Sequence, residues 1–202
     1  MSSFSSFKTF GDALTHFNVV SAIDNILFVE KECVIAPYFA AELNFTMKKT
    51  AYNISEAAIC EAIIYPVLRE VWKNFAESLS IWSHQSLSKK AKNSGIPDYI
   101  IAKSSPLGKD VMDMPMLVMI EAKKDDFDEG WGQCLAQLHL AQQLNHQAFR
   151  VYGIVSNGEV WQFGYLENNT LTKNEYAINI SDLQKLCNSL YFIFEMCEKQ
   201  LK

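Results

Sequence analysis

The sequence predicts an α/β fold in which helices pack on a mixed β-sheet, and three observations lead to this prediction. Strand-like and helix-like stretches alternate along most of the chain instead of gathering in separate halves. The pair Asn157-Gly158 separates two strand-like stretches, as is typical of a β-hairpin. Hydrophobic side chains recur at helical spacing in the stretches that lie between and after the strands.

Length and composition fit one globular unit. The chain has 202 residues, of which 49% are hydrophobic and 20% are charged. That balance excludes a disordered or fibrous chain. Because no repeat or Gly/Pro-rich linker divides the sequence, we expect a single domain over residues 1–202. Within it we expect a helical N-terminal extension over residues 1–50, with short helices at Thr9–Phe17 and Pro37–Met47, and the core over residues 51–202.

The expected core begins with a helix and three strands. Ser55 can cap a helix that runs toward Phe75, with Glu56 in the first turn, where an acidic residue is favoured. Pro66 lies inside this helix and should kink it, because its ring removes a backbone donor. Three strand-like stretches follow, at Leu79–Leu87, Tyr99–Lys103 and Met116–Ile120.

A second helix, a hairpin, another strand and a third helix complete the expected core. The hairpin turn at Asn157-Gly158 should be of type I′, because these two residues tolerate a positive φ. The expected elements are a helix capped by Asp126 or Asp128, a hairpin of Val151–Ser156 and Glu159–Tyr165, a strand over Leu171–Ile180, and a helix capped by Ser181 or Asp182.

Charge and cysteine usage restrict the functional classes. The formal charge is −5, from 18 Lys and Arg against 23 Asp and Glu. This balance argues against a protein that coats nucleic acid by bulk charge, although a local groove can still hold it. The five cysteines form no C-x-x-C pair, which favours free thiols in a reducing cytoplasm. The longest apolar run, Cys33–Ala41, is far shorter than the ~20 residues of a membrane helix, so we expect a cytoplasmic protein without a membrane partner.

Two charged residues end the most apolar strand of the sequence. Glu121 and Lys123 follow Met116–Ile120, and side chains two apart on a strand share one face. If that face is covered, the two charges must be matched or coordinated to offset their desolvation. The alternative is a strand that simply leaves the core for the acidic loop over residues 125–128.

Other polar residues lie where packing alone does not place them. Asp98 precedes a strand, although a turn also explains it. Glu61 falls on the apolar face of its helix at regular helical spacing, whereas Glu70 falls outside that face and is expected to be a solvated charge. Gln133 and Gln137 follow an inward stripe of the next helix, where amides bonded to backbone carbonyls are the alternative.

This set of residues suits hydrolysis assisted by a hard cation. Carboxylates without His or Cys partners favour Mg²⁺, with Mn²⁺ as a substitute. Asp98 and Glu121 would hold the metal together with the Ala122 carbonyl, and Glu61 would hold a metal-bound water or complete a second site. Lys123 would orient or deprotonate the attacking water and offset charge on a phosphate. The reaction indicated is metal-assisted phosphodiester hydrolysis.

These residues also carry a family resemblance. Ile96-Pro97-Asp98, followed by Glu121-Ala122-Lys123 after an apolar strand, resembles the signature of the PD-(D/E)xK nuclease superfamily. Three flanking segments are similar to the same group, in particular to the nuclease domains of type I restriction motor subunits and small stand-alone bacterial relatives. They are Ser55–Glu70, Gly130–Gln137 and Val151–Tyr165.

The resemblance implies a restriction-endonuclease-like fold, dependence on Mg²⁺, and DNA as the substrate, with RNA as a second possibility. It assigns Asp98, Glu121 and Lys123 as the catalytic core and Glu61 as the helix carboxylate. It also matches Gln133 to the glutamine of a Q-x-x-x-Y element, whose tyrosine position is occupied here by Gln137.

Several alternatives remain open from the sequence. The protein could keep the nuclease-like fold as a non-catalytic scaffold for binding or regulation, because fold does not fix function. The charged cluster could also be an internal salt-bridge network. The basic cluster Lys89, Lys90 and Lys92 is either a solvated loop or a rim that contacts phosphates. The sequence does not decide whether the chain forms a homodimer.

Overall fold

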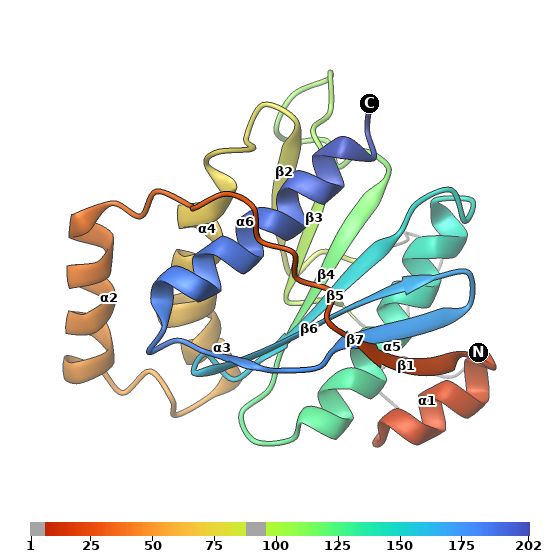
Figure 1. Ribbon diagram of the computed structural model, residues 1–202, viewed down its shortest axis with the longest axis horizontal. Coiled ribbons are helices and arrows are strands. Elements are labelled where there is room, and N and C mark those ends of the chain that lie inside the picture. Colours follow the sequence, from red (N-terminus) through yellow and green to blue (C-terminus); the bar gives the residue numbers. More distant parts are fainter. Residues whose placement is uncertain (1–6, 88–95) are drawn as a thin grey trace.

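The computed structural model describes residues 7–87 and 96–202, and it confirms an α/β fold built on one mixed sheet (Figure 1). The strands run in the order β1-β7-β6-β5-β4-β3-β2, and β8 pairs with β6. Their bounds are β1 Val20–Asp24, β2 Leu79–Ser83, β3 Tyr99–Lys103, β4 Met116–Ala122, β5 Val151–Ser156, β6 Val160–Glu167, β7 Thr170–Asn174 and β8 Ile178–Asn179.

Helices cover both faces of this sheet (Figure 1). One face packs against α5 and α1, and the other packs against the continuous helical segment α3-η2-α4 and against α6. The remaining helix, α2, lies at the periphery. The bounds are α1 Phe10–Phe17, α2 Pro37–Lys49, α3 Glu56–Ile59, η2 Cys60–Ile64, α4 Tyr65–Trp72, α5 Phe127–Leu144 and α6 Leu183–Lys199.

Strand β4 lies inside the sheet and is buried along its whole length. It pairs antiparallel with β3 and parallel with β5, which is why its sequence is an unbroken apolar run from Met116 to Ile120. Alternation along the strand turns Ile120 and Ala122 toward the core under α4 and α6. Met119 faces the core under α5, so Glu121 and Lys123, two and four residues later, lie on the α5 side as well.

The two helices expected within the first 50 residues form as α1 and α2, and a strand that was not expected, β1, lies between them. Strand β1 pairs parallel with β7, and α1 packs closely on α5. Gly132 of α5 permits that approach, because a Cβ there would lie 2.8 Å from the Thr9 carbonyl oxygen. Strand β1 is short and mostly exposed, so its sequence lacks the alternation that signals a half-buried strand.

The predicted helix from Ser55 forms, but its register differs from a regular α-helix. The Ser55 hydroxyl caps it by accepting from the Ala58 N–H at 3.1 Å. A π-helical turn then follows, in which the Tyr65 N–H donates to the Cys60 carbonyl. This wider turn lies directly before Pro66, the residue expected to disturb the helix.

The π turn reverses the predicted burial of two glutamates. Glu61 was expected on the apolar face, yet it is exposed. Glu70 was expected in solvent, yet it is buried, accepts from the Ala36 N–H at 3.0 Å and pairs with Lys73 at 2.6 Å. Extrapolation at a constant 3.6 residues per turn fails across a turn closed by an i→i+5 bond.

The C-terminal half departs from expectation at two places. Only Gly158 of the hairpin pair has a positive φ, so the turn is not type I′. Instead, the Asn157 side chain accepts from the N–H groups of Glu159 and Val160 in a three-residue loop. The expected strand over Leu171–Ile180 is divided into β7 and β8. No helix in the described part of the chain is long and apolar enough to cross a membrane.

Candidate functional site

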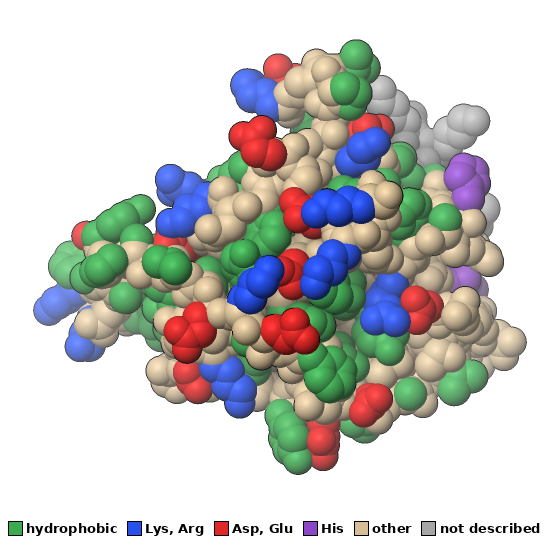
Figure 2. Space-filling view, turned by 45° about the horizontal axis from the view of Figure 1, so that its top comes forward, with side chains coloured by type: hydrophobic (Ala, Val, Ile, Leu, Met, Phe, Trp, Pro, Cys, Tyr) green, Lys and Arg blue, Asp and Glu red, His purple; other side chains and the backbone are tan. Residues whose placement is uncertain are grey.

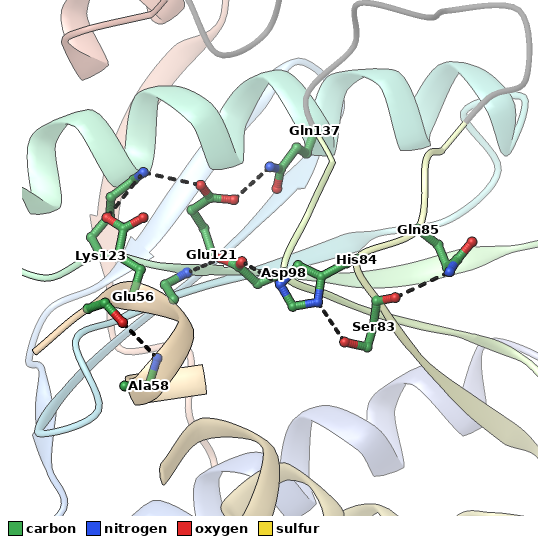
Figure 3. Close-up of polar contacts among 11 residues, drawn as sticks. Glu56, Ala58, Ser83, His84, Gln85, Asp98, Glu121, Lys123 and Gln137 are labelled. Carbon is green, nitrogen blue, oxygen red and sulfur yellow. Dashed lines mark hydrogen bonds and ion pairs between the residues drawn. The ribbon is translucent and has the colours of Figure 1, made fainter. Parts of the chain in front are cut away.

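Three of the predicted residues meet where the start of β3 adjoins the end of β4 (Figure 3). The antiparallel register pairs Tyr99 with Ile120, which places Asp98 opposite Glu121 on the neighbouring strand. Lys123 follows directly after β4 on the same side as Glu121. Local sequence contributes to this arrangement, because both strands are apolar next to the site and the acids lie at this end.

Asp98 is anchored to β4 by a backbone hydrogen bond. Its Oδ2 accepts from the Ala122 N–H at 2.7 Å, and its Oδ1 lies 3.4 Å from His84 Nε2. Burial raises the pKa of Asp98, although the Ala122 bond and His84 oppose that shift. A strand residue presents its N–H and C=O to the same neighbour, so the Ala122 carbonyl also lies on the side of β4 that faces β3.

Glu121 is the most deeply buried acid of the site, with 8% of its side chain exposed. Its Oε2 accepts from Gln137 Nε2 at 2.7 Å, and its Oε1 lies 3.5 Å from Lys123 Nζ. Burial and, after it, the nearby charge of Asp98 raise the pKa of Glu121 to about 7. The two carboxylates therefore repel each other in a region with little water.

Lys123 is enclosed by three carboxylates. Its Nζ lies 3.5 Å from Glu121, 3.7 Å from Glu56 of α3 and 3.8 Å from Glu129 of α5. Burial lowers the pKa of Lys123, but the three acids outweigh this and raise it overall. Gly130 lets α5 pass over the lysine, because a Cβ at this position would lie 2.8 Å from Lys123 Cγ.

Helix α5 carries a polar stripe above β4, formed by Glu129, Gln133 and Gln137 at successive four-residue intervals. Gln133 Nε2 donates to Glu129 Oε1 at 2.7 Å, so this amide reaches the acid beside Lys123. Gln137 reaches Glu121 itself. The helix starts where the sequence predicts, with Asp126 accepting from the Glu129 N–H at 2.9 Å.

The oxygen donors of the site are chemically suited to Mg²⁺. Within the described ranges, no three His, Cys, Asp or Glu residues are arranged to hold a metal. Mg²⁺ often takes only one or two protein carboxylates and keeps several waters, so the available set would be Asp98, Glu121 and the Ala122 carbonyl. Burial raises the pKa of both acids, and a bound divalent cation would favour their ionised forms.

Some of the predicted site residues lie together in the structure, and others lie apart from them. Asp98, Glu121 and Lys123 come together with Ala122, and Gln133 joins them indirectly through Glu129. Glu61 is exposed, and the carboxylate that reaches Lys123 from its helical segment is Glu56 instead. The basic cluster over residues 88–95 lies outside the described residues.

Four contributors to this site were not predicted, namely Glu56, Glu129, His84 and the direct bond from Gln137. Glu56 and Glu129 each occupy the first turn of a helix, where an acid is ordinary. Both helices begin beside the end of β4, and for Glu56 this proximity has no signal in the sequence. His84 adopts a positive φ of 51° just beyond β2, a local feature with no signature in the sequence.

No protein-family model matches the chain, and no characterised protein matches it significantly.

Proposed function

We propose that this protein is a metal-dependent nuclease of the PD-(D/E)xK type, with a restriction-endonuclease-like core, that hydrolyses phosphodiester bonds in DNA. One observation carries the proposal. Asp98, just before β3, meets Glu121 and Lys123 at the end of β4, and the ammonium lies 3.5 Å from the buried acid. Burial and, after it, the charge of Asp98 raise the pKa of Glu121, and a purely structural cluster has no need for a second carboxylate beside a buried one.

Each group has a distinct part in the proposed reaction. Asp98, Glu121 and the Ala122 carbonyl would hold Mg²⁺ or Mn²⁺, which supplies Lewis acidity and lowers the pKa of coordinated water. Lys123 carries its proton at neutral pH because its pKa is raised. It therefore serves as a donor that orients the attacking water and neutralises charge on the phosphate, and this role is favoured over that of a general base.

The acidic surroundings make DNA binding dependent on the metal. Glu56 and Glu129 lie within 4 Å of Lys123 and are partly exposed, so they line the approach to the lysine. On the face shown in Figure 2, acidic and basic side chains of the described residues alternate without a large basic patch, and the overall charge is −5. A bound divalent cation would reduce the repulsion between this rim and a phosphate backbone.

Cleavage assays test the proposal directly. Supercoiled plasmid, linear duplex, single-stranded DNA and RNA are incubated with the protein in Mn²⁺, in Mg²⁺ and in EDTA. We expect cleavage of DNA with either metal and none in EDTA. Asp98→Asn should abolish it while the melting temperature stays at or above that of the wild type, because a repelling charge is removed.

A non-catalytic scaffold is the second candidate. The observation that favours it is the enclosure of Lys123 by three carboxylates, which is also what a structural ion-pair network provides. Failure of the protein to bind Mn²⁺, together with intact DNA and RNA under every condition, would establish the scaffold and exclude the nuclease.

A further inference from the structure

Gln137 is an amide in a position suited to a hydrophobic residue. It lies in the middle of α5, it is 2% exposed, and its neighbours Cys134, Leu138 and Ala141 are completely buried. This face of α5 packs against the sheet. Packing alone would favour leucine or methionine at this position, because neither brings a polar group into the core.

The amide of Gln137 forms a hydrogen bond through its nitrogen but, among the described residues, none through its oxygen. Nε2 donates to Glu121 Oε2 at 2.7 Å. Oε1 is buried and has no hydrogen-bond partner among the described residues. Burial of an unpaired acceptor is unfavourable, so the advantage of glutamine here must come from the donor that reaches Glu121.

The donor controls the orientation of a carboxylate that would otherwise rotate. Gln137 contacts Oε2 of Glu121, and Lys123 contacts Oε1 (Figure 3). The first contact comes from α5, which packs on β4, and the second comes from the residue that follows β4. Together they fix the plane of the carboxylate while each oxygen keeps a second lone pair.

We propose that Gln137 is a positioning residue, which holds Glu121 so that the carboxylate presents Oε1 toward Lys123 and a divalent cation. The inference rests on the proposed nuclease function and assigns a new role within it. Gln133, one turn earlier, performs the equivalent task for Glu129. Helix α5 would thereby orient two of the acids that contact Lys123, which are Glu121 of β4 and Glu129 of α5 itself.

The same helix provides a matched control. Gln142 is also a buried amide of α5, but it donates to the Leu166 carbonyl of β6 at 2.8 Å. Gln142→Met removes a buried amide hydrogen bond away from Glu121 and Lys123. Gln137→Met removes one that touches Glu121, and Gln137→Leu repeats the test with a different side-chain shape.

The experiment measures binding of Mn²⁺ alone to the full chain by electron paramagnetic resonance. Loss of a group that orients a metal ligand costs about 10- to 100-fold in metal affinity. We therefore expect Gln137→Met and Gln137→Leu to raise the Kd for Mn²⁺ by about that factor, and Gln142→Met to leave it within about twofold of the wild type. With DNA at saturating metal, kcat should fall in the Gln137 variants while KM for DNA stays constant.

The outcomes separate this inference from the function on which it rests. If the wild type binds Mn²⁺ and the folded Gln137 variants bind it equally well, the positioning role is wrong and the nuclease proposal stands. If Gln142→Met weakens binding as much as Gln137→Met, the effect is one of general packing, and the positioning role is again wrong. If the wild type itself fails to bind Mn²⁺, both proposals fail.

Discussion

Replacing Glu121 with glutamine is expected to stabilise the metal-free protein at pH 8 while abolishing cleavage. The physical reason is the charge that the folded protein keeps in a dry region. Burial and Asp98 raise the pKa of Glu121 from the ordinary 4.5 to about 7. The folded state therefore binds this proton more tightly than the unfolded chain does, and it becomes less stable as the pH rises between those two values.

The size of the effect follows from the same two values. Each tenfold change in an ionisation constant corresponds to about 1.4 kcal/mol, so ionising Glu121 costs the folded state on the order of 3 kcal/mol above pH 7. Glutamine removes that cost and keeps the shape. If the Gln137 amide turns over, the new amide nitrogen can donate to Gln137 Oε1, which replaces the bond from Gln137 Nε2, while the new amide oxygen accepts from Lys123.

Urea denaturation at pH 5 and at pH 8, in EDTA, measures this effect. The wild type should lose stability over that interval relative to Glu121→Gln, and the variant should be the more stable protein at pH 8. Glu70→Gln is the matched control, because Glu70 is equally buried but is paired with Lys73 at 2.6 Å. That control should be destabilised. A Glu121→Gln variant that is less stable than the wild type at pH 8 would refute the reasoning.

Three further predictions concern the neighbouring helices. Glu61→Gln should leave the cleavage rate within about twofold of the wild type, because Glu61 is exposed. A loss above tenfold would show that Glu61 takes part in the reaction. Glu56→Gln should lower KM for DNA about two- to fivefold at low salt, with less effect at high salt, since it removes an acid 3.7 Å from Lys123. Gly130→Ala should destabilise the fold by about 1–3 kcal/mol in urea denaturation, because the added Cβ would lie 2.7 Å from Val155 and 2.8 Å from Lys123; unchanged stability would mean that α5 does not press on the lysine.

The central strands and their charged ends could be predicted because the relevant information is local. Strand β4 is apolar on both faces up to Ile120. The first charged residues, Glu121 and Lys123, occur at its end and mark the edge of the core. These features depend on neighbours in the sequence. The register that places Asp98, one residue before β3, opposite Glu121 was not predicted.

The errors arose where distant contacts or irregular backbone decide the structure. Strand β1 is recognisable only through its pairing with β7, about 150 residues away. The π turn shifts the faces of the α3-η2-α4 segment. As a result, Glu61 is exposed and Glu70 is buried, the reverse of what was predicted. Glu56 acts in the site only because the start of its helix lies beside Lys123, a proximity that the sequence does not contain.

The measurement that tests the central claim most directly is Mn²⁺-dependent DNA cleavage by the wild type, Lys123→Ala and Lys124→Ala. Lys124 is the adjacent lysine and is exposed, so its replacement controls for the loss of one positive charge. We predict that Lys123→Ala loses at least about 100-fold in cleavage rate while both variants remain folded, and that Lys124→Ala cleaves like the wild type. Cleavage by folded Lys123→Ala at the wild-type rate would contradict the assignment of this site.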